Sequence, residues 1–301
     1  MTRFIHHFRR RFTMKMKQTI APALAAVTAL GLLLWASNAQ ASISAGFDDG
    51  AGNTLVDQYP GVAGDGWSTA WEATSNASAS VNNASPLNGG GNYLTATTDT
   101  ASARGVKRAY TNFGDVDLSQ VHVIKFDWRF DGNIANFASD SDRLYIADGS
   151  AGGLGESGAT AFHIRAHGDD RGTANGGEWA VYNGDQDQEG DIDDNKWVNT
   201  GMAFQAGVVY TFTVTLDPAN RTYDVDIDNG TTDVTVNAIG FKTSATTVAG
   251  TLNFMSRKST GVDDLSYSID SISIAVPEPA SLMLLGVGAV LALGREPRSN
   301  D

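Results

Sequence analysis

The sequence predicts an all-β fold, an antiparallel β-sandwich, and two patterns support this prediction. Apolar and polar residues alternate with a period of two over residues 121–130, 208–217 and 222–228, as in strands with one buried face. Glycine, asparagine and aspartate fill the connections, for example at Asn229-Gly230, and such pairs favour tight hairpin turns. Strands of this kind bury their apolar faces best as two facing sheets.

Composition and charge limit the classes of function. The chain has 301 residues, no cysteine and a formal net charge of −13. Six Lys or Arg and no acidic residue lie in the first 41 residues, so the remainder has a net charge of −19. An acidic body of this kind repels nucleic acid and attracts divalent cations. We therefore expect no nucleic-acid partner.

The first 41 residues have the three parts of an export signal. A basic stretch precedes an apolar run over residues 20–35, and the small-residue triplet Ala39-Gln40-Ala41 follows. The apolar run is about 16 residues long, shorter than the roughly 20 that a membrane span needs. We predict a signal helix that the Sec translocon recognises, with cleavage after Ala41.

The C-terminus combines a short box with an apolar run. Pro277, Glu278 and Pro279 form the box, residues 282–293 are apolar, and Arg295 and Arg298 follow. This order resembles the PEP-CTERM sorting signal of Gram-negative bacteria, although Glu296 and Pro297 interrupt the basic end. The resemblance implies that a membrane-embedded exosortase cuts near the box and releases the protein.

The tail is too short for a stable anchor. A helix of about 14 apolar residues spans about 20 Å, against a hydrocarbon core of about 30 Å. We expect transient anchoring of this short hydrophobic helix in the inner membrane, and then a secreted or cell-surface protein. The predicted domains are a signal peptide (residues 1–41), a sandwich (residues 42–275) and a sorting signal (residues 276–301).

The two ends of the sandwich suggest its topology. Gly46-Phe47-Asp48-Asp49-Gly50 opens it, and residues 265–274 close it with a break in alternation that predicts a bulge at Asp270-Ser271. Together with the predicted hairpin over residues 210–228, these ends resemble jelly-roll domains of the concanavalin-like and carbohydrate-binding-module type. The resemblance implies that the first and last strands are neighbours.

Two groups of acidic residues could hold a structural Ca²⁺ ion. The spacing of the first resembles an EF-hand loop, although Lys196 stands where a bidentate Glu is expected; a solvated acidic loop is the alternative. This group comprises Asp185, Asp187, Glu189, Asp191 and Asp193. The second site would form where Asp48 or Asp49 meets Asp270, because the first and last strands are neighbours in jelly rolls; ordinary turn and edge aspartates are the alternative.

A candidate ligand-binding face follows from strand alternation. His163, Arg165 and His167 lie on one face of a predicted strand, opposite Phe162 and Ile164. An arginine can hold a carboxylate through two parallel hydrogen bonds, so this face would suit an anionic exopolysaccharide. The predicted ligand-binding residues are Arg143, Tyr145, His163, Arg165, His167 and Tyr182. A strand carrying Lys125, Asp127 and Arg129 is expected to lie beside them.

Catalytic motifs are mostly absent from the sequence. It contains no Gly-x-Ser-x-Gly, no His-Glu-x-x-His and no Glu-x-Asp-x-x-Glu pattern. Because PEP-CTERM systems accompany exopolysaccharide production, the resemblance implies a non-catalytic glycan-binding protein of the extracellular or biofilm matrix. A polysaccharide lyase or glycoside hydrolase on the same fold is the alternative; in a lyase, Arg would neutralise a uronate and His or Tyr would move a proton. A structural coat protein without a ligand is the second alternative.

Overall fold

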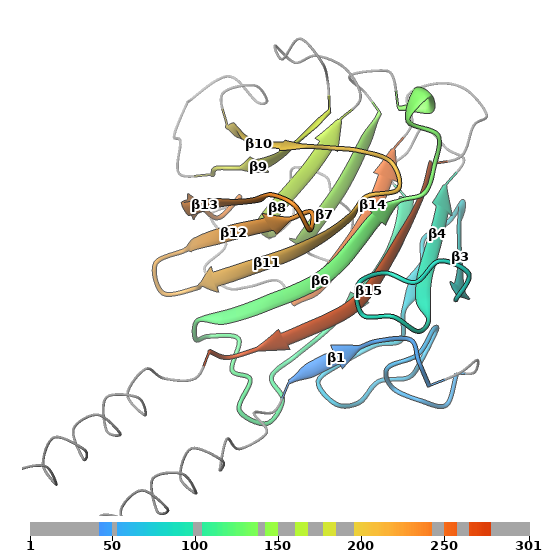
Figure 1. Ribbon diagram of the computed structural model, residues 1–301. Coiled ribbons are helices and arrows are strands. Elements are labelled where there is room, and N and C mark those ends of the chain that lie inside the picture. Colours follow the sequence, from blue (N-terminus) through green and yellow to red (C-terminus); the bar gives the residue numbers. More distant parts are fainter. Residues whose placement is uncertain are drawn as a thin grey trace, which may run out of the picture. The chain divides into compact units, whose positions relative to one another are not determined.

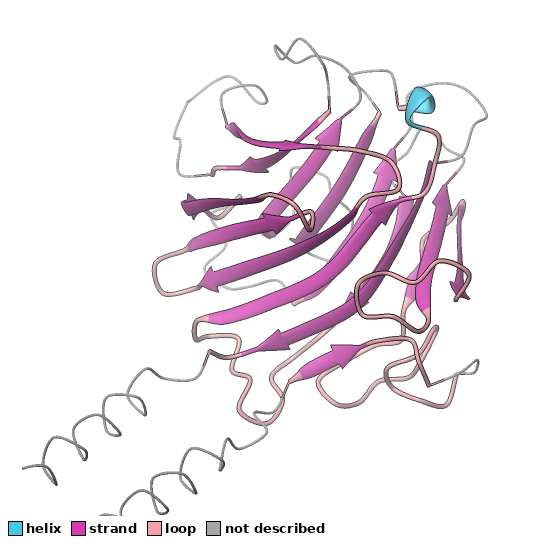
Figure 2. Ribbon diagram, viewed as in Figure 1, coloured by secondary structure: helices cyan, strands magenta, loops and turns pink. Residues whose placement is uncertain are grey.

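The computed structural model describes residues 42–49, 53–98, 104–137, 142–149, 160–167, 177–184, 196–242, 250–257 and 265–277. Residues 41–277 form one compact unit. Strands and loops make up nearly all of the described part, with one short 3₁₀ helix at Ile134–Asn136 (Figure 2). No helix among these residues has the length and apolarity that a membrane span requires. The predicted signal helix and C-terminal helix lie outside the described residues.

Within the described residues, the strands form two antiparallel sheets (Figure 1). One, the β6 sheet, places β6 between β11 and β15, and β1 also pairs with β15. Its strands, in spatial order, are β13 (Asp233–Gly240), β12 (Thr222–Asp228), β11 (Val209–Asp217), β6 (His122–Phe130), β15 (Leu265–Ala275), β4 (Tyr93–Thr98) and β3 (Ala77–Asn82), with β1 at Ile43–Ala45. The predicted all-β antiparallel architecture is confirmed.

The second sheet, the β8 sheet, lies against the first and contains the predicted ligand-binding strands. Its strands, in spatial order, are β10 (Trp197–Ala203), β9 (Glu178–Tyr182), β8 (Thr160–His167), β7 (Arg143–Gly149), β14 (Thr251–Arg257), β5 (Arg104–Ala109) and β2 (Glu72–Ala73). The strand β14 comes from a distant part of the chain, yet it pairs with both β5 and β7. Long-range pairing therefore fixes which side chains adjoin the site.

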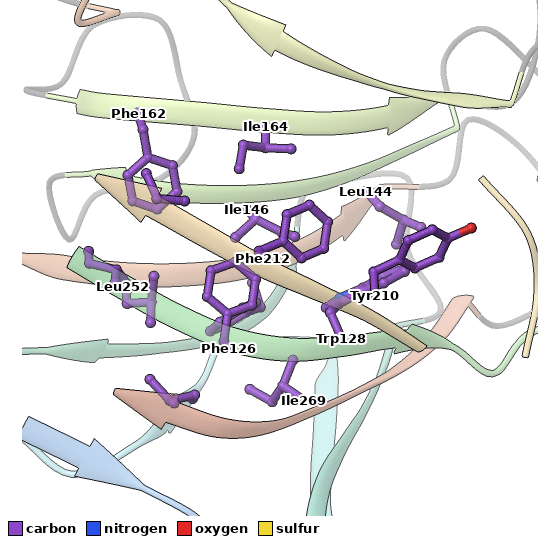
Figure 3. Packing of buried hydrophobic residues seen from close by; sticks show 14 of the residues in the cluster. Phe126, Trp128, Leu144, Ile146, Phe162, Ile164, Tyr210, Phe212, Leu252 and Ile269 are labelled. Atoms are coloured by element: carbon purple, nitrogen blue, oxygen red, sulfur yellow. The ribbon is translucent and has the colours of Figure 1, made fainter. Parts of the chain in front are cut away.

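The core fills the space between the sheets, as Figure 3 shows. Phe126 and Phe212 on the β6 sheet stack with ring centroids 5.1 Å apart, and Phe254 of β14 meets Phe126 edge-on at 5.1 Å. Trp128 meets Trp179 of β9 edge-on at 5.0 Å. Truncating a buried aromatic ring typically costs about 3–5 kcal/mol, so these contacts between the sheets hold the two layers in a fixed relation.

The first and last strands are neighbours, as the jelly-roll resemblance implies. Ile43 of β1 pairs with Ile274 of β15, and both side chains are fully buried. The pairing of β15 with β6 shifts register between Asp270 and Ser273, and Ser271 has a φ of 53°. The predicted bulge at Asp270-Ser271 is thus present, and its effect is to keep Ile269 and Ile272 both in the core.

Candidate functional site

The candidate site lies on the outer face of the β8 sheet. In β8, Phe162, Ile164 and Ala166 point into the core, so alternation sends His163 and Arg165 to the opposite face. These two side chains are nonetheless only 2% and 3% exposed. Because buried polar groups are normally hydrogen-bonded, other side chains must cover these two residues on the outer face of the sheet.

Cross-strand register brings the other predicted residues to these two. Tyr145 of β7 pairs directly with Arg165, and β9 pairs with the opposite side of β8 through Ile164 and Val181. Because the strands are antiparallel, this register places Tyr182 opposite His163. Tyr182 in turn pairs with Trp197 of β10. One face therefore carries a continuous group from four neighbouring strands.

Aromatic rings surround His163. Its imidazole centroid lies 5.3 Å from the ring of Tyr145 and 5.0 Å from that of Trp197, the latter edge-on. Tyr182 stacks more loosely at 6.3 Å and contacts Trp197 at 5.1 Å. Rings of this kind supply flat apolar surface against which a sugar can stack, while the hydroxyl groups of the two tyrosines provide polar ends.

Cations lie against these rings. The guanidinium carbon of Arg165 is 3.7 Å from the ring centroid of Trp197, and Nζ of Lys242 is 5.2 Å from the centroid of Tyr182. Such cation–π contacts are worth about 0.5–2 kcal/mol each, more when water is excluded. Trp197 and Lys242 were not predicted as site residues. A single Lys following a strand has no local pattern that would identify it.

The imidazole of His163 is neutral. Burial, followed by the positive charges of Lys242, Arg165 and Arg143, holds the pKa of His163 well below its usual value. Its Nδ1 lies 2.8 Å from Nζ of Lys242. A neutral imidazole in a cationic, aromatic environment can give or take a hydrogen bond but carries no charge of its own at neutral pH.

Arg143 lies at the edge of this group. It is half-buried, and its Nη1 donates to Oη of Tyr145 at 3.4 Å. In register with it lie Arg257 of β14 and His167 of β8; the side chain of His167 lies outside the described residues. Two arginines, Arg143 and Arg257, therefore lie directly across neighbouring strands at this edge.

One expected neighbour is absent from the site. Lys125, Asp127 and Arg129 lie on β6, which belongs to the other sheet, so the expectation that they lie beside Tyr145 and His163 is wrong. The consecutive strands β6 and β7 thus belong to different sheets. Local alternation gives the face of each strand but not the sheet to which it belongs.

Two aspartates of the β6 sheet form a separate, acidic group. Asp127 and Asp270 pair across β6 and β15, and they are only 5% and 2% exposed. Burial, and then the charges of Asp127 and Asp48, raises the pKa of Asp270 to about 7, against hydrogen bonds from Ser271 that lower it. Thr211 donates to Asp127 at 2.6 Å. Asp48, Asp127 and Asp270 thus lie near enough to one another for their charges to interact.

Metal binding stays a prediction. Among the residues that the structure describes, no group of three or more His, Asp or Glu side chains has an arrangement that could hold a metal ion. The five acidic residues of the predicted EF-hand-like loop lie outside the described residues.

Comparisons with known proteins give one match to a family model. The model described as the PEP-CTERM protein-sorting motif matches residues 275–299, which include Pro277, Glu278 and Pro279. No curated protein matches the sequence.

Solved structures resemble the sandwich at low sequence identity. A catalytic domain of a glycoside hydrolase family 131 protein from Coprinopsis cinerea is 10% identical over 78% of this chain and 93% of that chain, with a TM-score of 0.49. An endo-β-1,4-glucuronan lyase from the fungus Trichoderma reesei is 11% identical over 70% and 92%, with a TM-score of 0.48. A sialidase is 14% identical over 74% of this chain, with a TM-score of 0.41, and this chain spans only 20% of that protein.

The sheet topology and the match to the family model together give the organisation of the chain. An antiparallel sandwich occupies the described part, and the sorting motif begins where the last strand, β15, ends at Ala275. The chain carries a PEP-CTERM protein-sorting motif, and it is thereby an exosortase-sorted, exported protein of a Gram-negative bacterium.

Proposed function

We propose that the sandwich binds an anionic exopolysaccharide outside the cell, on the outer face of the β8 sheet, without catalysis. The proposal rests on one cluster: Arg165, Lys242 and three aromatic rings lie in contact with one another around His163. A body with a net charge of −19 repels anions in general, so a local cationic and aromatic face favours a specific anionic ligand. Uronate-containing glycans combine the carboxylate and the sugar ring that this face suits.

The order of contact follows from burial. Tyr182, Trp197 and Lys242 are partly exposed, whereas His163 and Arg165 are nearly fully buried. A polymer would first meet the outer rings and the ammonium group, and a carboxylate would reach Arg165 when the Trp197 ring moves aside. Binding should therefore change the fluorescence of Trp197.

The test of this proposal is titration of the exported protein with a uronate-containing polymer at low and high salt. Arg165→Ala should weaken binding by about 1.5–3 kcal/mol, because a charged hydrogen-bonding partner is lost, and the loss should be larger at low salt. Tyr182→Ala should also weaken binding, by removal of a stacking surface. Lys125→Ala removes one charge from an exposed position on the other sheet and is the matched control.

The outcomes distinguish a glycan-binding sandwich from a structural coat protein without a ligand. Unchanged affinity in both site variants would contradict this ligand face. No affinity in the parent protein for any charged polymer would leave the structural coat protein as the better explanation.

One observation favours a second candidate, a polysaccharide lyase. Tyr145 lies against the neutral imidazole of His163 and pairs with Arg165, and these three residue types suit β-elimination of a uronate. In that reaction a base removes the proton beside the carboxylate, the glycosidic C–O bond breaks, and the leaving oxygen takes up a proton. An ultraviolet-absorbing unsaturated product, lost in Tyr145→Phe, would establish this activity.

The ends of the sandwich also suggest how the protein is processed. We infer that the Sec translocon and an exosortase act on opposite ends, with brief anchoring in the inner membrane between the two steps. β1 begins two residues after Ala41, and β15 ends two residues before Pro277. Mass spectrometry of the exported protein should detect neither residues 1–41 nor residues 282–293; an intact C-terminus on exported protein would contradict exosortase cleavage.

A further inference from the structure

We propose that Lys242 fixes His163 in the tautomer that carries its proton on Nε2, so that His163 offers a second hydrogen-bond donor to the ligand beside Arg165. This inference rests on the proposed function, because it names how the same face recognises an anionic sugar. The acceptor would be a carboxylate or hydroxyl oxygen of the glycan. Lys242 then acts as a positioning residue.

The contact between Lys242 and His163 determines the tautomer. Nζ of Lys242 lies 2.8 Å from Nδ1 of His163. A lysine ammonium group has three donors and no acceptor, so Nδ1 must accept and cannot carry a proton. In a neutral imidazole the remaining proton is then on Nε2.

The proton on Nε2 has no acceptor among the described residues. Nε2 of His163 is buried there and has no hydrogen-bond partner. A buried donor without a partner costs about 1–3 kcal/mol. A donor left unsatisfied beside aromatic rings and cations is explained if a ligand supplies the acceptor.

The charges near His163 indicate which acceptor is suitable. Among the described residues, the charged groups that act on His163 are Lys242, Arg165 and Arg143, all cations. Tyr145 and Trp197 adjoin its ring. An anionic oxygen gains from these cations in addition to the Nε2 proton, so a carboxylate is favoured over a neutral hydroxyl group.

The same geometry limits the role of His163 in any elimination. With Nδ1 occupied by Lys242 and Nε2 protonated, the ring has no free lone pair to accept a proton. His163 would therefore be a donor to the substrate carboxylate, and another group would have to be the base.

His122 is an internal reference with the opposite tautomer. Its Nδ1 lies 2.9 Å from the backbone carbonyl oxygen of Gln120, and a carbonyl can only accept. His122 must therefore carry its proton on Nδ1. The two histidines, both buried, should show opposite patterns of nitrogen protonation in one protein.

The first experiment is a long-range ¹H–¹⁵N correlation spectrum of the imidazole nitrogens at neutral pH, with assignments from His163→Gln and His122→Gln. We expect an Nε2–H signature for His163 and an Nδ1–H signature for His122. Lys242→Met should release His163 to a mixture of tautomers, Lys242→Arg should retain Nε2–H, and Lys125→Met should have no effect. An Nδ1–H signature for His163 in the parent protein would overturn the inference, whatever the protein binds.

The second experiment titrates the same uronate-containing polymer and its carboxyl-reduced form. His163→Ala should lose about tenfold or more in affinity for the uronate form, whereas His163→Gln, which retains a side-chain donor, should lose much less. If the parent binds the polymer and both variants bind it equally well, the donor role of His163 is wrong while the proposed function stands. If the parent binds neither polymer, the proposed function fails, and with it the ligand of His163.

Discussion

The outer faces of the two sheets carry different buried ionisable groups, although the same strand alternation produces both. The buried polar residues of the β6 sheet include the paired carboxylates Asp127 and Asp270, and Arg129 is buried two residues along from Asp127. Those of the β8 sheet include His163 and Arg165, which lie against aromatic rings. The net charge of the protein therefore does not describe each face: within one acidic chain, one face carries two paired, buried carboxylates and the other a buried arginine beside a lysine.

Burial acts in the same direction on both faces. It disfavours the charged form of any group, so it raises the pKa of Asp270 and lowers the pKa of His163. Each face thus holds one buried titratable group whose neutral form burial favours. Charge, pH and metal can be used to test whether the two faces differ in this way.

The largest effect should come from reversing one charge on each face. Arg165→Glu places a carboxylate in a nearly fully buried position and should lower the free energy of unfolding by about 3–5 kcal/mol. Lys125→Glu makes the same change at an exposed position of the β6 sheet and should change it by less than about 0.5 kcal/mol. Chemical denaturation measures both; equal losses would contradict the burial of the Arg165 site.

Calcium should distinguish the two predicted acidic sites. A bound ion should raise the free energy of unfolding by about 2.7 kcal/mol when free Ca²⁺ is a hundredfold above its dissociation constant, and a chelator should lower the melting temperature. Asp270→Asn should abolish this effect if the ion binds at Asp48 and Asp270. Asp187→Asn should abolish it if the ion binds at the acidic loop. A melting temperature that neither chelator nor calcium changes would leave only solvated acidic residues.

Without metal, the paired carboxylates Asp127 and Asp270, the acidic face of the β6 sheet, should destabilise the protein as the pH rises. The pKa of Asp270 is about 7 in the folded protein, above its ordinary value of 3.8. The folded state therefore retains a proton that the unfolded state loses, and stability falls between about pH 4 and 7. The loss should be about 2 kcal/mol, because a unit of pKa difference corresponds to about 1.4 kcal/mol and water entry relieves part of the shift.

Asp270→Asn isolates this contribution. The variant should keep its stability over the same range of pH, and chelator should be present throughout so that metal binding does not obscure the comparison. Thermal unfolding at intervals between pH 4 and 8 measures the effect. A parallel decline in the parent protein and the variant would assign the pH dependence to other groups.

The sequence predicts the faces of the strands better than the neighbours of each strand. Alternation alone places His163 and Arg165 on one face, and the break at Asp270-Ser271 predicts the bulge that the structure contains. It does not predict that β6 and β7 lie in different sheets, because that depends on pairing between distant segments.

Contacts between distant segments also explain why some residues of the two groups could not be predicted. Lys242 reaches His163 from 79 positions away, and Asp127 meets Asp270 through pairing of β6 with the last strand. No short pattern marks either pair. Local alternation therefore predicts which residues of one strand share a face. Which residues of other segments join them depends on the sheet topology, which the sequence does not show.

The smallest expected effect concerns the hydrogen bond that supports the acidic face. Thr211 donates from Oγ1 to Oδ1 of Asp127 at 2.6 Å, and Asn88 donates to the same hydroxyl oxygen at 3.1 Å. Thr211→Val keeps the shape and the β-branched side chain but removes both bonds, which should cost about 1–1.5 kcal/mol of unfolding free energy. Thr213→Val makes the same change two residues along the same face and should alter it by less than about 0.5 kcal/mol. Because Asp127 lies on the face away from the proposed ligand site, neither variant should change the affinity for a uronate-containing polymer; a loss of affinity in Thr211→Val would show that the two faces are coupled.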